Sequence, residues 1–128
     1  MSSKNEDYVL PVAMSDQGTA IVVGVAVTLP VLVRMAISQV QCSLGVVSSA
    51  GIVTVNIKKN GATIFTTKVT IDANEASSLT AAAAAVLIEN PTLISPGDVL
   101  SFEIDGAGTG AKGLCAWLLG NLKGKIEQ

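Results

Sequence analysis

The chain has 128 residues, enough for one domain with a single buried core. Apolar residues make up 49 % and charged residues only 14 %, which excludes a disordered chain and leaves too little charge to solvate the whole surface. The formal net charge is -2 and the basic residues are scattered, so neither nucleic acid nor anionic lipid is an expected partner.

The two ends differ from the middle of the chain. Residues 1–8 are predicted to be a polar leader or arm, residues 9–122 a β-sandwich domain, and residues 123–128 a polar tail. The leader lacks the cationic start and apolar centre of a signal peptide, so no export signal is expected. The uncharged segment Gly18–Val33 is too short to span a bilayer, and no membrane partner is expected.

Short strands and turns follow the leader. Tyr8–Met14 is predicted to be the first strand, and Ser15–Gly18 a turn. Thr19–Leu29 is almost wholly apolar, which predicts two short strands or one strand with a bulge at Gly24. Pro30 cannot donate to a strand ladder, so it is expected at a sheet edge or corner.

Met35–Leu44 and Ile52–Lys59 alternate as half-buried strands do. In the first of them, Ser38 is the one polar residue on the predicted inner side. In the second, the inner side chains are expected to be those of Val53, Val55 and Ile57.

Asn60-Gly61 gives the sharpest local signal. Both residues tolerate the positive φ of a type I′ turn, so a hairpin is predicted between Ile52–Lys59 and Ala62–Lys68. Later strands are predicted over Val99–Asp105, with an alternating inner face, and Gly113–Leu119.

Asn74–Glu89 is ambiguous. It contains five consecutive alanines after a candidate cap at Asn74, a pattern that favours a helix. However, Ser77, Ser78 and Thr80 compete for the backbone and no polar helix face follows them, so extended structure is preferred and helix remains the alternative.

About eight short strands separated by Gly, Pro, Asn and Asp turns predict an all-β fold, a jelly-roll-like antiparallel β-sandwich. The prediction does not depend on the ambiguous segment.

Catalysis is not expected, because the chain has no histidine to serve as a general base. Glu103 and Asp105 lie on one strand side near Asp98, but no aromatic sugar platform accompanies them and surface charge is the preferred interpretation. The glycine run between Asp105 and Gly113 lacks the Gly-Lys-Ser/Thr of a phosphate loop, so a flexible hairpin loop is predicted.

No metal or cofactor site is predicted. Cys42 and Cys115 have no CxxC spacing and no histidine to complete a zinc set; each is interpreted as a small buried hydrophobe, with a disulfide left open. Asp72, Asn74 and Glu75 lack the spacing of a calcium loop, and turn capping explains them better.

Trp117 is the only tryptophan, and it is interpreted either as an interface anchor or as a core residue. The residues predicted to meet a partner are Trp117, Tyr8, Val9 and Leu10.

Four segments together resemble small structural modules of tailed bacteriophages. They are Ile57–Phe65 (IKKNGATIF), Thr70–Ser78 (TIDANEASS), Gly97–Asp105 (GDVLSFEID), and Gly108–Gly113 with Leu114 (GTGAKGL). The resemblance covers about residues 52 to 120, and the N-terminal third matches poorly. It implies a virion component, either a capsid decoration or cement protein or a piece of a tail fibre or baseplate, usually a homotrimer, and it implies no catalytic residue.

The chain is therefore expected to be a trimeric cement protein that is made in the host cytoplasm and binds the major capsid protein on the virion surface. One compact domain without a fibre shaft favours this interpretation. The alternative is a tail fibre or baseplate module for host adhesion that binds surface glycan through residues such as Gly106–Gly110.

Overall fold

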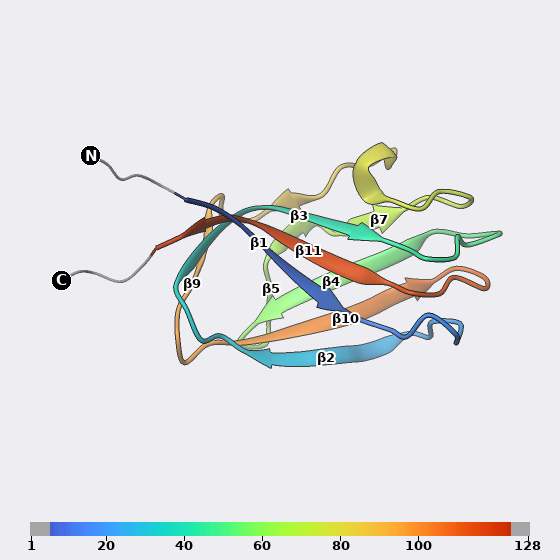
Figure 1. Cartoon of the computed structure of the whole chain (residues 1–128). Helices are drawn as coiled ribbons and strands as arrows, with labels where there is room; N and C mark the ends of the chain where they lie inside the picture. Colours follow the sequence, from blue (N-terminus) through green and yellow to red (C-terminus); the bar gives the residue numbers. More distant parts are fainter. Residues whose placement is uncertain (1–5, 124–128) are drawn as a thin grey trace.

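The computed structural model describes residues 6–123, which form an antiparallel β-sandwich (Figure 1). The strands are β1 (Glu6–Ala13), β2 (Gly24–Pro30), β3 (Met35–Ser43), β4 (Val53–Lys59), β5 (Ala62–Thr63), β6 (Phe65–Thr67), β7 (Val69–Ile71), β8 (Val86–Leu87), β9 (Thr92–Ile94), β10 (Val99–Ala107) and β11 (Cys115–Leu122). One short 3-10 helix, η1 (Ser78–Thr80), lies between β7 and β8.

The strand pairs are nested. β1 pairs with β11, β2 with β10, β3 with β9, and β4 with β7, as in one long hairpin that has been rolled up. The result is two main sheets, one of order β1-β11-β3-β9 and one of order β2-β10-β4-β5 with β7 also on β4, and β6 and β8 form a separate two-stranded sheet. Counting β5 and β7 as one interrupted position, eight strand positions form two sheets, which is the predicted jelly-roll arrangement.

The core lies between the two sheets and is built by alternation. Val53, Val55 and Ile57 of β4 are fully buried, as predicted. The inner residues of β10 are buried beside them. Ala116 and Leu118 of β11 face them from the other sheet, so the two inner faces exclude water from each other.

Ser38 is exposed, so its predicted place on the inner side is wrong. Ile37 pairs with Gly120 and Gln39 with Leu119, which leaves Ser38 as an extra, bulged residue. Its hydroxyl donates to the carbonyl of Leu119 at 3.3 Å. The bulge changes the parity of the strand, so that Ile37 and Val40 both point into the core.

The first two strands differ from their predicted bounds. β1 begins at Glu6, inside the predicted leader, while residues 1–5 and 124–128 of the predicted leader and tail lie outside the described residues. Only Gly24–Pro30 of the apolar segment forms a strand, and its register shifts opposite Phe102 and Glu103. β2 ends its sheet, so Pro30 occupies an edge as expected.

The Asn60-Gly61 hairpin is confirmed. Asn60 and Gly61 have φ of 53° and 89°, and Lys59 pairs with Ala62 across the turn. The strand expected after it is split into β5 and β6, because Phe65 leaves β4 and pairs with Leu87 of β8 instead.

The alanine-rich segment is extended rather than α-helical. The described chain from 74 to 89 contains only the short helix η1, capped by the Ser77 hydroxyl, which accepts from the Leu79 amide, and the two-residue strand β8. Asn74 does not cap a helix; it adopts a φ of 66° in a turn.

Replacing Asn60 with alanine should lower the free energy of unfolding by about 2 kcal/mol. The Asn60 amide donates to the Asp98 carboxylate at 3.0 Å and its carbonyl accepts from the Val99 amide at 2.9 Å, so the turn would lose both contacts. Denaturant titration measures the change. Asn60→Gly, which removes the same bonds but relieves the positive φ, should be less destabilising than Asn60→Ala.

The same contact gives a pH signature. Hydrogen bonds from the Asn60 side chain and then the Ser95 amide lower the pKa of Asp98 below its ordinary 3.8. A lowered pKa in the folded state stabilises the protein above 3.8, and that contribution is lost as pH falls through the folded pKa. NMR titration should show the Asp98 pKa closer to 3.8 in Asn60→Ala; an unchanged pKa would contradict the assignment.

Candidate interaction surface

The outer face of the β1–β11–β3 sheet carries an uncharged patch, called here the apolar face. The register places Pro11, Trp117 and Gln41 in one row across the three strands. Rows on either side complete the apolar face, whose members are Val9, Pro11, Ala13, Cys115, Trp117, Leu119, Gln39, Gln41 and Ser43. Their parity is opposite to that of the buried Val12, Val40, Cys42, Ala116 and Leu118, so all nine are turned away from the core.

Trp117 lies at the centre of this face. Its side chain is on the outer side of β11 and 37 % of the residue is exposed, so its interpretation as a core residue is wrong. The indole Nε1 donates to the hydroxyl of Ser43 at 2.9 Å, which fixes the ring over the neighbouring strand. A ring held in place in this way loses little conformational freedom on contact with a partner.

The outer face of the other sheet carries ion pairs beside the exposed Val25 of β2. Lys58 of β4 and Glu103 of β10 form an ion pair at 3.3 Å. Asp105 pairs with Lys68 at 2.6 Å. Mutual pairing on a partly exposed strand face suits contact with water.

The four predicted interface residues do not lie together. Val9 and Trp117 both belong to the apolar face. Tyr8 and Leu10 have the opposite parity and are half-buried at the open end of the sandwich. There they line an apolar cavity of about 280 Å³. The residues that the sequence analysis missed, Pro11, Ala13 and Leu119, have the same parity as Val9 and Trp117, so alternation could have identified them.

The two cysteines are free and lie on opposite sides of one sheet. Cys42 is in the core, and burial raises its pKa to about 12. Cys115 pairs with Ser43 and belongs to the apolar face, where partial burial raises its pKa above the ordinary value. The interpretation as a buried hydrophobe therefore holds for Cys42, and no disulfide joins the pair.

The polar side chains at Asp98 and in the Asp72–Glu75 segment make structural contacts. Asp98 accepts hydrogen bonds from the Asn60 side chain and the Ser95 amide. In the candidate calcium segment, Asp72 accepts from the Ala82 amide and Glu75 from the Thr80 hydroxyl. Within residues 6–123 no group of three metal-ligating side chains comes together.

The glycine run forms a turn next to the loop after β3. The buried Ser48 hydroxyl accepts from the Thr109 amide at 3.0 Å and donates to the carbonyls of Ala50 and Gly51. Gly108 and Gly110 have positive φ, as a tight connection requires. Across the described chain, no helix has the length and apolarity needed to cross a membrane.

No protein-family model matches the chain, and neither the curated proteins nor the solved structures include a significant match.

The thiols should differ sharply in reactivity. A pKa of about 12 keeps Cys42 protonated, and its burial denies access, so iodoacetamide at pH 8 should label Cys115 but not Cys42 in dilute native protein. Intact-mass measurement should show one adduct in buffer and two in denaturant, and the single variants Cys42→Ser and Cys115→Ser assign them. Labelling of native Cys42 would show that the core opens on this timescale.

Proposed function

We propose that this chain is a non-enzymatic virion protein, a decoration or cement protein that assembles as a homotrimer on the head of a tailed bacteriophage and stabilises it by binding the major capsid protein. The observation that carries the proposal is the contrast between the apolar face and the ion-paired outer face of the other sheet. Such a contrast is expected of a module that binds a partner through one face and contacts water with the opposite face.

The apolar face suits a structural contact. Trp117 supplies an aromatic anchor at its centre, and Val9, Pro11 and Leu119 surround it without charge, so burial against another subunit removes apolar area and desolvates no ion. A protein that binds only the assembled shell stabilises that state by its binding free energy. Many weakly bound copies would then add up to a substantial effect on the head.

The resemblance to phage modules supports the same function. Its four segments occupy the β4–β5 hairpin, the turn after β7, the turn leading into β10 with that strand, and the connection from β10 to β11. These are central strands and tight turns, so the residues that resemble phage modules are ones that maintain the fold. The apolar face lies mainly on β1, β3 and β11, largely outside those segments, as expected where related modules meet different partners.

Host adhesion is the second candidate. It would use the loop around Gly106–Gly110, yet no aromatic residue lies in that loop to stack on a sugar. The Ser48 contacts explain the glycines as structural residues.

Val9→Glu should weaken self-assembly. It places a charge on the apolar face, none of whose members can pair with it, so the trimer dissociation constant should rise by at least about tenfold. Val25→Glu is the matched control, because Val25 is an exposed valine on an edge strand of the other sheet, 63 % exposed against 47 % for Val9. Sedimentation equilibrium measures both variants.

Capsid binding is tested separately, with tailed-phage capsids stripped of minor proteins. Wild-type protein should co-sediment at saturating stoichiometry and raise the melting temperature of the shells, and Val9→Glu should do so less than Val25→Glu. If the protein forms trimers and binds host cells but does not bind capsids, host adhesion is the function and the cement assignment is wrong. Equal loss of capsid binding in Val9→Glu and Val25→Glu would show that the apolar face is not the binding surface.

A further inference from the structure

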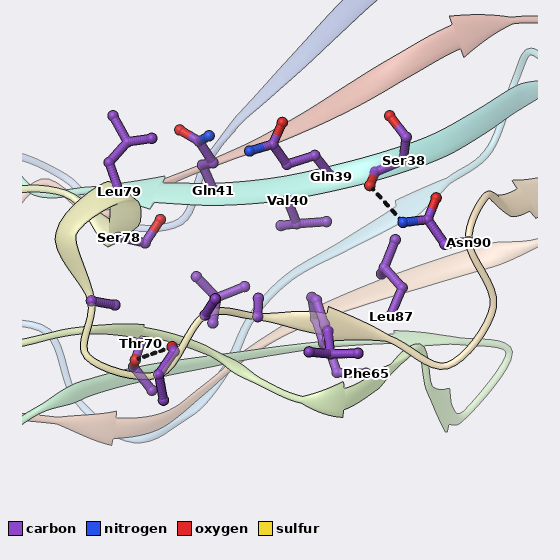
Figure 2. Close-up of a pocket in the computed structure, with 16 residues that line it drawn as sticks. Ser38, Gln39, Val40, Gln41, Phe65, Thr70, Ser78, Leu79, Leu87 and Asn90 are labelled. Carbon is purple, nitrogen blue, oxygen red and sulfur yellow. Dashed lines mark hydrogen bonds between the residues drawn. The ribbon is translucent and has the colours of Figure 1, made fainter.

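A groove of about 440 Å³ runs along the outer edge of β3 (Figure 2). One wall is β3 from Ser38 to Gln41, and the other is the alanine-rich segment from Ala81 to Leu87. Phe65 and Val69 close its base. Figure 2 shows Val40 and Leu87 directed into the space between the two walls.

The groove exists because the strand ladder beside β3 is interrupted. β9 pairs with β3 only along Met35–Ile37, and the next backbone contact on that edge is the bridge between Ser43 and Ser77. Between these points, side chains replace a strand. Asn90 donates to the carbonyl of Ser38 at 3.1 Å, and the Ser78 hydroxyl accepts from the amide of Cys42 at 2.9 Å.

Val40 lies midway between these two side-chain contacts. The N–H and C=O of successive residues in an antiparallel strand point alternately to either side. The Cys42 amide points into the groove, so the N–H and C=O of Val40 point there too. Within residues 6–123 no strand pairs with β3 at this position on that side, although only 5 % of Val40 is exposed. Buried backbone groups of this kind are normally paired.

We propose that the groove binds an uncharged, extended peptide segment of another protein by strand addition to β3. The peptide backbone would pair with Val40 and complete the ladder between β9 and the Ser43–Ser77 bridge. None of the lining residues is charged, and small alanine side chains form the opposite wall, so the occupant has apolar or hydroxyl side chains and no ionic group facing the groove. This inference does not depend on the virion assignment.

The charges of the terminal segments argue against them as the occupant. Residues 1–5 include Lys4, and residues 124–128 include Lys125 and Glu127. The uncharged lining offers these ionic groups no partner, so a segment without charges fits the groove better and a peptide of another protein is favoured.

The test uses isotope-labelled full-length protein and an acetylated, amidated hexapeptide of alternating threonine and valine. Titration should move the Val40 amide resonance most, and hydrogen exchange at Val40 should slow about tenfold when the free peptide is at ten times its dissociation constant. Ala84→Trp fills the groove and should weaken binding at least about tenfold. Ala82→Trp is the matched control, because Ala82 is exposed in the same segment but does not line the groove.

The chemistry of the peptide backbone gives a second test. The same hexapeptide with N-methylated amides cannot donate to β3 and should bind at least about tenfold more weakly. Equal binding of the methylated peptide, or resonance shifts that avoid Val40, would overturn strand addition. Tighter binding of peptides matching residues 1–5 or 124–128 would overturn the assignment to another protein and identify a terminal segment of this chain as the occupant.

Discussion

The fold depends on the packing of two inner sheet faces that contain almost no polar atoms. Ile57 and Phe102 on one sheet and Leu118 on the other are completely buried, and aliphatic neighbours fill the space around them. Expulsion of water from these faces is the dominant favourable term in folding. Because the inner face of each sheet is buried, contacts with other molecules are left to the two outer faces, the strand edges and the loops.

The few charges of the chain are distributed unevenly over those remaining surfaces. Lys58, Lys68, Glu103 and Asp105 are paired on one side of the sandwich, whereas the apolar face on β1, β3 and β11 has no charged member and has Trp117 at its centre. The edge of β3 is also only partly covered, because two polar side chains rather than a strand bond to its backbone. The same sheet therefore offers two kinds of contact, side-chain packing on its outer face and backbone pairing at this edge.

Local signals predicted much of this fold. Alternation identified the central strands, and Asn60-Gly61 located the hairpin because its conformation is dictated by those two residues alone. The bulge at Ser38 was not predictable, since an extra residue is defined only relative to the partner strand β11. The groove depends on β6 leaving β4 to pair with the distant β8, which no local pattern encodes. Tyr8 and Leu10 were placed with Val9 although parity separates them.

The nested pairing also sets which strand pairs must close long loops of chain. The β4–β7 pair joins neighbouring segments, whereas β1 must wait for β11, which comes from the other end of the described chain. Closing so long a loop carries the largest entropic cost and favours slow folding. On the ribosome, β1 and β2 emerge before their partners β11 and β10, so their uncharged residues remain unpaired while the intervening strands are made. A cell that makes this protein must keep those strands from associating with other chains until β10 and β11 emerge.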